Sequence, residues 1–392
     1  MGGAIHNVYK GRQPVVIFAG SSPFTLEQEL KGSRNEFIQW IQDVHDQRGI
    51  VRGYTNYTNE FRTGKNIKQV THRALQFATS DPKGPVYLVG PREVMEEDVN
   101  PLPLDMSVWT PVNPCALPPS GVKDIVNSLL TAKHPLVVTS YLGKNPKAVN
   151  RLVELADRLA IAVHESCPSA MNFPASHPAH QGCQWNGGGQ SPALAEADVI
   201  LVIDSDVPWI PKESKPMKGA KIFHLDVDPL KEQMPLFYIP AQNRYKTDAE
   251  TALTQILEGL EEKQIDTEGV KKRLDYLKQR HQQRIQRLDK AEVIPSSGNI
   301  STPVLMGIFR KVIPKRSIFM IEVIISYDGK YLITGNYSVW VLFRSLPLRS
   351  PWTSLRFWSR QSRLGSRSLY WRSSSSQRHE WGFGRDRSNR LR

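Results

Sequence analysis

The sequence predicts an α/β fold built on parallel sheets, and two patterns carry this prediction. Short apolar runs bounded by glycine and proline alternate along the first 326 residues with segments whose apolar side chains recur at helical spacing. Several of the runs are continuously apolar, as buried strands are. Strands that alternate with helices favour helices layered on parallel sheets. A chain of 392 residues is long enough for two or three such domains.

The positive charge of the chain belongs to its C-terminal part. Of the formal net charge of +13, a share of +10 lies in residues 327–392, where 13 Lys and Arg stand against three Asp and Glu. The first 326 residues are nearly neutral, so their composition does not indicate nucleic-acid binding. No apolar run approaches the roughly 18–20 residues that a membrane span needs, so no membrane contact is expected.

The three cysteines, Cys115, Cys167 and Cys183, are too few and too scattered for a disulfide framework. They favour a reducing compartment. We expect an intracellular protein, cytoplasmic by default, with a mitochondrial location left open if a segment upstream of Met1 carries a transit peptide.

The first predicted unit covers residues 1–104. Residues 14–20 form a predicted buried strand that ends in the small-residue loop Ser21-Ser22-Pro23. Apolar residues at helical spacing predict a helix over 65–79, and a second strand covers 84–91 between glycine and proline breakers. The proline-rich stretch that follows predicts an inter-domain linker over 105–118.

A second unit, over residues 119–262, has the pattern of a Rossmann-like domain. Ser120 is positioned to cap its first helix. Pro146 is predicted to begin a helix that runs to Leu159, as a first-turn proline does. Four predicted strands alternate with the helices: 136–139, 160–164, 199–204 and 221–226.

The last third of the chain changes character twice. Residues 263–300 have a thin apolar stripe on a charged helix, which predicts a helical connector. Residues 301–326 predict the opening of a third unit, with an amphipathic helix and a strand over 317–321. Residues 327–392 have no persistent helical or strand period and are rich in serine and arginine. We expect this basic tail to be disordered.

Five pieces of the body resemble one enzyme family in the order in which that family has them. They are GGAIHNVYKGRQPVVIFAGSSP, KQVTHRALQFATSDPKGPVYLVGPREV, FPASHPAHQGCQWNGGG, ADVILVIDSDVPWIP and AKIFHLDVDP. Together they resemble thiamine-diphosphate (ThDP)-dependent enzymes, and the acetolactate synthase-like branch fits best. The resemblance implies part of a pyrimidine-binding domain over 1–104, a middle domain over 119–262, and the start of a pyrophosphate-binding domain over 301–326.

The resemblance implies a cofactor and a reaction class. Members use thiamine diphosphate and Mg²⁺ to decarboxylate or join 2-keto acids such as pyruvate, the cofactor acting as an electron sink. A Glu contacts the pyrimidine ring, and a Gly-Asp-Gly motif with a later Asn supplies oxygen ligands to Mg²⁺. Full-length members form homo-oligomers, because the cofactor lies between the pyrimidine domain of one subunit and the pyrophosphate domain of another.

Three departures from the family pattern qualify this expectation. The family's Glu lies upstream of the point where Met1 begins, and the 392 residues contain no Gly-Asp-Gly. Glu36-Phe37-Ile38 stands where acetolactate synthases have Phe-Gln-Glu. Residues 205–208 stand where an FAD-binding Arg is expected, so FAD is not expected. We expect a chain truncated at both ends, without catalytic residues of its own and inactive in this form.

Six residues are candidates for contact with the cofactor or a nucleotide. Gly20, Ser21 and Ser22 lie at the carboxyl end of the first strand, expected to be central in its sheet, where α/β sheets bind ligands. A tight turn without a ligand explains them equally well.

The other three candidates lie in the middle domain. Asp226 and Asp228 end a strand as an acid that meets a ribose does, although Asp228-Pro229 is also an ordinary turn. Gly143 lies in the first strand-to-helix loop of that domain. No metal site is assigned, because the spacing of Cys167, His177, His180 and Cys183 matches no standard zinc pattern.

The tail leaves a different class of function open. Arg-Ser pairs interleaved with Trp352, Trp358 and Trp371 are compatible with single-stranded RNA, through phosphate pairing and stacking. Arg, Ser and Leu each have six codons, so an out-of-frame translation has the same composition, and this explanation is favoured over nucleic-acid binding. The alternative to an enzyme is thus a non-catalytic protein with a nucleotide-binding middle domain or an RNA-binding tail.

Overall fold

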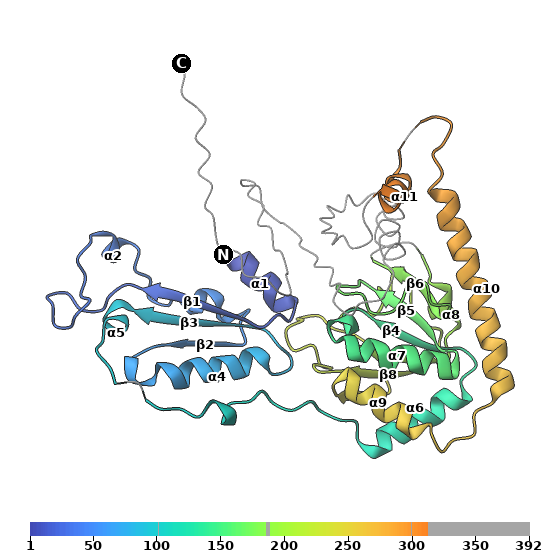
Figure 1. Cartoon of the computed structure of the whole chain (residues 1–392), viewed down its shortest axis with the longest axis horizontal. Coiled ribbons are helices and arrows are strands. Elements are labelled where there is room, and N and C mark those ends of the chain that lie inside the picture. The colour runs from blue at the N-terminus through green and yellow to red at the C-terminus, as the bar shows by residue number, and fades with distance from the viewer. Residues whose placement is uncertain (101, 186–188, 299, 313–392) are drawn as a thin grey trace. The chain divides into compact units, whose positions relative to one another are not determined.

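The computed structural model describes residues 1–100, 102–185, 189–298 and 300–312. Within them lie two parallel sheets, each with helices packed on it, as Figure 1 shows. The predicted α/β class with parallel sheets is therefore confirmed. The predicted strand over 317–321 and the basic tail fall outside the described residues.

The N-terminal sheet has three parallel strands in the order β1-β3-β2. Strands β1 and β3 confirm the two predicted strands. Strand β2 was not predicted, because Tyr-Thr-Asn-Glu is short and polar and becomes a strand only by pairing with β3. The bounds are β1 (Val15–Ser21), β2 (Tyr57–Glu60) and β3 (Pro85–Pro91).

One helix of this region carries most of its packing. Helix α4 (Ile67–Thr79) lies against β3 and β2, where Ala74 and Ala78 contact Val86 and Leu88 in a buried cluster. It confirms the predicted helix, and its first residue follows a short 3-10 turn, Gly64–Asn66. The other helices here are α1 (Gly2–Lys10), α2 (Ile38–Ile41), α3 (Gly49–Arg52) and α5 (Arg92–Met95).

Strand β1 corrects the sequence prediction in two respects. It was predicted as a buried and central strand, but it lies at the end of the described sheet and pairs only with β3. Val16 and Phe18 are 42% and 54% exposed. Apolar composition alone predicts a strand but not its neighbours, and in the described residues no helix covers the even-numbered side chains of β1.

The second sheet has six parallel strands in the order β6-β5-β4-β7-β8-β9. Its central strands β4 and β7 are buried along their whole length. A sheet with strands on both sides and cover on both faces accounts for their continuous apolar sequence. The bounds are β4 (Pro135–Thr139), β5 (Ala162–Ser166), β6 (His180–Gln184), β7 (Val199–Ile203), β8 (Lys221–Asp226) and β9 (Asn243–Lys246).

Helices cover the two faces of this sheet unequally. One face packs its apolar side chains against three helices in the larger buried cluster, and Figure 1 shows these helices together. The other face packs against a short helix and irregular chain that includes Trp209 and Ile239. The helices are α6 (Pro119–Thr131), α7 (Pro146–Leu159) and α9 (Ala249–Gly259) on the first face, and α8 (Pro192–Glu196) on the second.

Four strands were predicted here, and two more are present. Strand β6 lies in the stretch that was interpreted as a loop, and β9 lies at the far edge. Both are short and polar, His-Gln-Gly-Cys-Gln and Asn-Arg-Tyr-Lys, so neither has a period that indicates a strand. Strand β5 begins two residues later than predicted because Ala160 ends α7 in the left-handed conformation, with φ 50°.

The predicted cap of α6 was wrong, whereas the predicted start of α7 is confirmed. Helix α6 begins at Pro119, so Ser120 lies inside the first turn and Pro118 occupies the cap position. Proline presets the helical φ and lacks the amide hydrogen that a cap would satisfy. Helix α7 begins at Pro146, and the Asn145 side chain accepts a hydrogen bond from the amide of Lys147.

The predicted helical connector contains α10 (Thr267–Ala291), capped by the Asp266 carboxylate. The guanidinium of Arg273 donates to the carbonyls of Leu159 and Ala132, at the C-terminal ends of α7 and α6. Helix α11 (Thr302–Val312) follows in the region of the predicted amphipathic helix. None of the described helices combines the length and apolar character that a membrane crossing needs.

Candidate functional site

The carboxyl edge of the six-stranded sheet is the candidate site. Strands β5 and β6 extend from β4 in one direction, and β7, β8 and β9 extend in the other. The chain thus reverses its direction of progress between β4 and β7. Open parallel sheets bind ligands at the carboxyl ends of the strands on either side of such a point. The loops after β4, β7 and β8 are therefore where a ligand of this domain would lie.

Backbone strain is concentrated at this edge. Cys167 follows β5 with φ 44°, Asp204 follows β7 with φ 48°, and Lys231 lies in the loop after β8 with φ 53°. A left-handed conformation at a residue other than glycine costs on the order of 1–3 kcal/mol and persists only where the surroundings impose it. The contacts of Lys231 show what imposes it there.

Lys231 is a buried cation that joins three strand-end loops. Its side chain is 1% exposed. The ammonium Nζ lies 2.5 Å from Oδ2 of Asp226 and 2.9 Å from Oδ1 of Asp206. It also donates to the hydroxyl of Tyr141 at 3.1 Å. The loops after β4, β7 and β8 are thus held together by one side chain.

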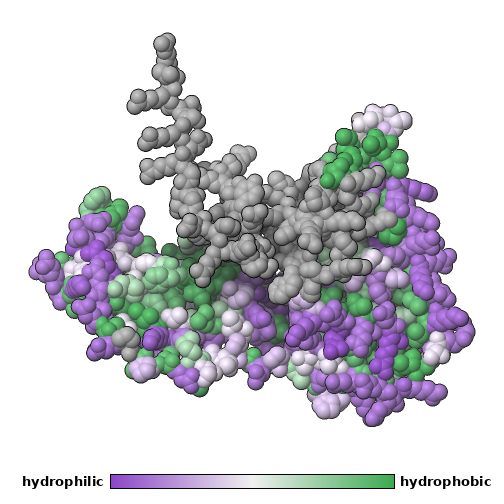
Figure 2. Space-filling model, viewed as in Figure 1, coloured by the Kyte–Doolittle hydropathy of each residue, from purple (hydrophilic) through white to green (hydrophobic). Residues whose placement is uncertain are grey.

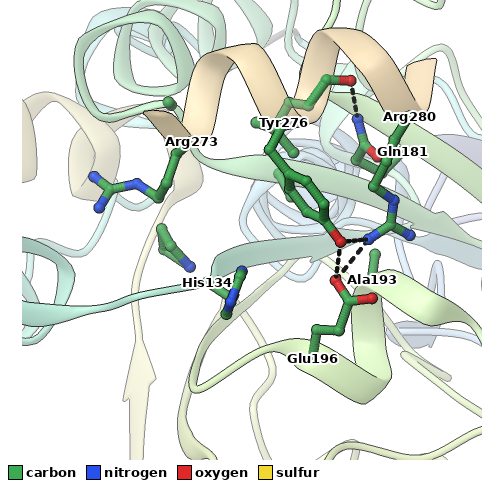
Figure 3. Close-up of a pocket in the computed structure, with 11 residues that line it drawn as sticks. His134, Gln181, Ala193, Glu196, Arg273, Tyr276 and Arg280 are labelled. Carbon is green, nitrogen blue, oxygen red and sulfur yellow. Dashed lines mark hydrogen bonds and ion pairs between the residues drawn. The ribbon is translucent and has the colours of Figure 1, made fainter. Parts of the chain in front are cut away.

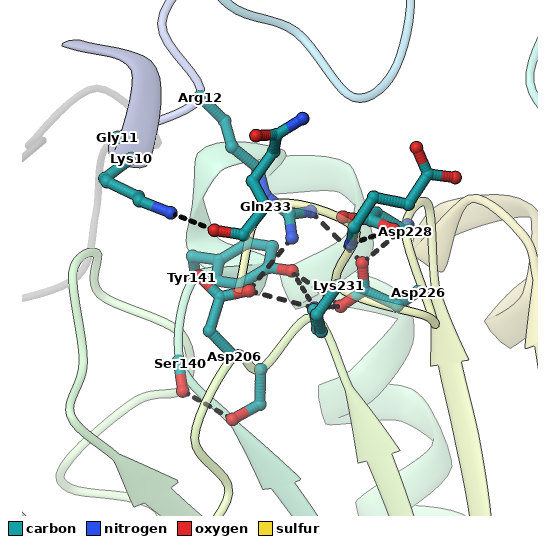
Figure 4. Close-up of polar contacts among 12 residues, drawn as sticks. Lys10, Gly11, Arg12, Ser140, Tyr141, Asp206, Asp226, Asp228, Lys231 and Gln233 are labelled. Atoms are coloured by element: carbon teal, nitrogen blue, oxygen red, sulfur yellow. Dashed lines mark hydrogen bonds and ion pairs between the residues drawn. The ribbon is translucent and has the colours of Figure 1, made fainter. Parts of the chain in front are cut away.

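Arg12, which follows α1, completes this cluster (Figure 4). Its guanidinium lies 3.1 Å from Oδ1 of Asp226 and 2.9 Å from Oδ1 of Asp206. It also lies 4.5 Å from the centre of the Tyr141 ring, close enough for a cation–π contact. Arg12, Tyr141, Asp206, Asp226 and Lys231 form what we call the ion cluster. Its two cations and two carboxylates balance, as buried charges must.

The cluster fixes the protonation states of its members. Burial acts to raise the pKa of Asp226, but Lys231 and Arg12 outweigh it, so this pKa lies below its ordinary value. Burial and the neighbouring Asp226 charge raise the pKa of Tyr141 well above 10. Tyr141 therefore remains a neutral phenol that donates to Oδ2 of Asp226 at 2.6 Å. Such a cluster is a stable set of ion pairs rather than a proton-transfer site.

Lys144 is a second unusual lysine near the cluster. It lies in the loop after β4, and its ammonium donates to the carbonyl of Gly11 at 2.5 Å. Burial, reinforced by the charge of Arg12, lowers its pKa from 10.5 to about 8. The lysine is held against the ring of Tyr141, with its ammonium 5.1 Å from the ring centre.

The three candidate residues of the middle domain are all occupied by contacts within the protein. Asp226 spends both carboxylate oxygens on the ion cluster, and its Oδ1 also accepts from the amide of Asp228 at 2.8 Å. The Gly143 amide donates to Oδ1 of Asn172 at 2.9 Å. A Cβ on Gly143 would lie 1.9 Å from the Met171 carbonyl oxygen, so this loop has no room for a side chain.

The N-terminal candidates lie on the other sheet. Gly20 and Ser21 belong to β1 instead of following it, because the pairing with β3 continues to Ser21 and Pro91; only Ser22 lies beyond the strand. The carbonyl of Gly20 accepts from Nε2 of Gln47 at 3.0 Å. A Cβ on Gly20 would meet nothing within 4 Å, so the space beside this residue is open.

A buried acid beside these residues was missed. Oε1 of Glu93, which lies just after β3, accepts from the amides of Phe24 and Thr25 and from the Thr25 hydroxyl, at 2.7–2.8 Å. Burial acts to raise its pKa, but the hydrogen bonds from Thr25 and Phe24 lower it below the ordinary value. Glu93 therefore anchors the loop after β1. The helix-like sequence Pro-Arg-Glu-Val gave no signal of this role.

Glu165 was also missed, although a signal for it exists. It ends β5, 22 residues after Gly143, which is the place of the ribose-binding acid in dinucleotide folds. Here it points inward, and its carboxyl group contacts Nδ2 of Asn172 at 2.9 Å and Nε2 of His180 at 3.0 Å. Burial raises its pKa to about 7. The acid that could meet a ribose is therefore engaged inside the protein.

The histidines and cysteines once weighed as a zinc set make separate contacts. His177 contacts Asp157, and Sγ of Cys167 donates to the carbonyl of Trp185. His180 contacts Glu165 as described. Over the residues that the structure describes, no group of three or more His, Cys, Asp or Glu is disposed to hold a metal ion.

A pocket lies at the opposite edge of the six-stranded sheet, between α10 and the amino ends of β4 and β5 (Figure 3). Tyr276 and Arg280 both donate to Oε2 of Glu196, at 2.8 and 2.7 Å. The Tyr276 ring meets that of His134 edge to face, with 6.1 Å between centres. Because these polar groups are paired with one another, they hold α10 on the sheet.

The middle of the chain matches a known domain family. Residues 122–255 match the family described as "Thiamine pyrophosphate enzyme, central domain". The chain belongs to the thiamine-diphosphate-dependent enzyme family. Its members include a probable acetolactate synthase large subunit of Methanocaldococcus jannaschii, 24% identical over 239 residues, and an acetolactate synthase of Bacillus subtilis, 23% identical over 186 residues. The acetolactate synthase-like resemblance is thereby confirmed.

These ThDP-family relatives are longer than this chain. The two matches cover 57% and 46% of this chain, but only 38% and 32% of the relatives. The solved structure of benzoylformate decarboxylase from Polynucleobacter necessarius has the same fold, with a TM-score of 0.62 and 15% identity. It covers 91% of this chain, which in turn covers 60% of that structure.

The described residues do not fit a complete site for ThDP and Mg²⁺. The metal–diphosphate group needs oxygen ligands that converge, as a Gly-Asp-Gly motif supplies, and the 392 residues contain no such motif. The carboxylates best placed at a strand edge, Asp206 and Asp226, are neutralised by Lys231 and Arg12. No catalytic step through the cofactor can therefore be built on these residues.

Proposed function

We propose that this chain derives from a ThDP-dependent decarboxylase or carboligase of the acetolactate synthase-like kind, acting on 2-keto acids such as pyruvate. The observation that carries the proposal is the match of residues 122–255 to the central domain of that family. The order of elements on both sides of the match supports it, as does the acetolactate synthase activity named for two relatives.

In this proposal the 392 residues do not catalyse the reaction by themselves. The acids at the strand edges are used within the protein: Asp226 in the ion cluster, Glu93 in anchoring a loop, and Glu165 in contact with Asn172 and His180. None of them is free to act on a cofactor. Residues outside this sequence would have to supply the groups that activate thiamine diphosphate and bind Mg²⁺.

The assay is carbon dioxide release from pyruvate by the purified chain with thiamine diphosphate and Mg²⁺. The expected result is a rate equal to that of buffer with the cofactor, and no change in intrinsic tryptophan fluorescence on adding the cofactor. A rate above that background that saturates with pyruvate would refute the proposed inactivity. It would at the same time support the proposed reaction class.

We also propose that the middle domain binds neither FAD nor another nucleotide. A ligand at its carboxyl edge would have to displace Lys231 from Asp226 and Asn172 from Gly143. Each displacement would leave buried polar groups unpaired, which costs about 1–3 kcal/mol per group and more for a charge.

Calorimetric titration with FAD and with ADP tests this proposal, and no heat of binding is expected. Saturable binding that is lost in Asp226→Asn would favour the rival function of a nucleotide-binding protein. A second rival, RNA binding by the tail, is favoured only if the full chain binds single-stranded RNA and loses that binding on deletion of residues 327–392.

A further inference from the structure

The outer edge of β1 offers unpaired backbone groups. Strand β1 pairs with β3 from Val15 to Ser21, and among the described residues no strand lies on its other side. In β3, the carbonyls of Pro85 and Val89 accept from Asn56 and Phe61 on the β2 side. The even-numbered residues of β3 therefore face β1.

The pairing register fixes which groups of β1 face outward. Because Val16 lies opposite Val86, and the even residues of β3 bond toward β1, the odd residues of β1 bond back toward β3. The backbone groups of Val16, Phe18 and Gly20 then point to the free edge. The contact of Gln47 with the carbonyl of Gly20 agrees with this assignment. An edge of this kind is a template for a further strand.

The side chains of the edge are apolar and uncovered. Val16 and Phe18 share the face that α4 covers on β3, yet they remain exposed. Figure 2 shows hydrophobic residues gathered over this region. Residues 15–21 include neither a charge nor a proline. Proteins commonly protect an edge strand with such residues, so this edge is built to pair rather than to repel.

We propose that two copies of this chain associate by antiparallel pairing of their β1 strands, with Phe18 opposite Phe18 of the second copy. This register uses the outward backbone groups of Val16, Phe18 and Gly20 in both copies. It also sets Val16 opposite Gly20 of the second copy. There the open space beside the glycine, with nothing within 4 Å of an added Cβ, accepts the valine.

Charge favours the antiparallel orientation over the parallel one. The chain enters β1 from the basic residues Lys10 and Arg12 and leaves it toward the acidic residues Glu27 and Glu29. Antiparallel pairing directs the basic approach of each copy toward the acidic exit of the other. A parallel arrangement would bring like charges together. The product is one continuous six-stranded sheet with the two Phe18 rings at its centre.

The first test is the mass of the full chain by light scattering, from about 1 to 100 μM, a range that brackets ordinary weak association. The wild type is expected to form a dimer. Phe18→Lys sets two like charges opposite each other and should raise the dimer dissociation constant about tenfold or more. Phe37→Lys is the matched control, because Phe37 is 74% exposed but lies outside β1, and it should dimerise as the wild type does.

A wild-type monomer throughout this range would overturn the proposal, as would a dimer that Phe18→Lys leaves intact. Unchanged far-ultraviolet circular dichroism in both lysine variants establishes that the difference is not one of folding. These outcomes are independent of the proposed catalytic class, because none of them measures turnover.

The second test is the register, in a Cys115→Ser background that removes the exposed cysteine. Phe18→Cys places two thiols on directly opposed residues, whose Cα atoms lie about 5.5 Å apart in such a pair, within disulfide reach. Val16→Cys places them four residues out of register. Mild oxidation should cross-link the first variant into a covalent dimer and leave the second uncross-linked. Equal cross-linking of both, or of Val16→Cys alone, would overturn the register.

Discussion

The two sheets are built from similar strand sequences and end in different surroundings. Residues Val15–Ser21 of β1 and Val199–Ile203 of β7 are both apolar and uncharged. Strand β7 is completely buried, whereas Phe18 of β1 remains more than half exposed. The difference comes from neighbours: β7 has a strand on each side and cover on both faces, and β1 has one strand. A strand sequence thus indicates a capacity for burial, which the rest of the fold does or does not supply.

The buried acids of the two regions provide the largest contrast. Asp226→Ala should leave Lys231 with a buried charge and a single carboxylate partner, and should lower the free energy of unfolding by about 3–5 kcal/mol. Glu93→Ala removes hydrogen bonds from neutral donors only, and about 1–3 kcal/mol is expected. Urea denaturation of each variant measures both values. Equal losses would show that the ion cluster adds nothing beyond ordinary hydrogen bonding.

Truncation of the two apolar strands should give a graded result. Leu201→Ala opens a cavity in the fully buried β7 and should cost about 2–5 kcal/mol. Val16→Ala removes an exposed side chain of β1, and a change within about 0.5 kcal/mol is expected. Thermal and urea unfolding measure the pair. A cost at Val16 similar to that at Leu201 would mean that β1 is covered in solution, as pairing of two copies requires.

Glu165 should give the middle domain a pH dependence that the N-terminal region lacks. Its pKa is raised from 4.5 to about 7 by burial, so between these values the folded chain holds a proton that the unfolded chain has released. Stability should therefore be highest below about pH 4.5 with respect to this group and fall as pH rises to about 7, by about 1–3 kcal/mol.

Glu165→Gln mimics the protonated acid and preserves contacts with Asn172 and His180. Its free energy of unfolding should lose this decline between pH 5 and pH 7. Glu154→Gln, at an exposed ion pair, is the control and should retain it. The same decline in Glu165→Gln would assign the pH dependence to another group.

The smallest expected difference concerns two helix starts. Asn145→Ala removes the side-chain oxygen that accepts from the amide of Lys147 and should cost about 1 kcal/mol. Ser120→Ala should be neutral, because Ser120 lies inside the first turn of α6. Chemical denaturation resolves the two if replicate errors stay below about 0.3 kcal/mol. A loss at Ser120 equal to that at Asn145 would restore the cap that the sequence predicted.

Local signals predicted the elements that have them. The apolar runs located β1, β3, β4, β7 and β8, and Pro146 located the start of α7. Strands β2, β6 and β9 have polar sequences and exist because a neighbouring strand offers its edge, which no local pattern reports. The exposure of β1 was beyond prediction for the same reason.

The candidate site was predicted in position but not in state. The place of Asp226 at the end of a strand could be predicted from the sequence, but its partners Arg12 and Lys231 are 214 and five residues away, and only the fold brings them together. Gly143 was correctly placed in a loop at the carboxyl edge, yet Asn172 fills that loop. Sequence spacing locates a crevice, whereas long-range side chains decide whether it is open.

The two carbonyls that accept from Arg273 have a consequence for how this molecule opens. They end α6 and α7, so the guanidinium on α10 caps two helices of the six-stranded domain from outside. Peeling α10 away would uncap both at once, since neither carbonyl has its own glycine cap. Local opening of α10 and fraying of the last turns of α6 and α7 should therefore be a single event. In hydrogen exchange, the amides of these three segments would respond together to denaturant and behave as one cooperative unit.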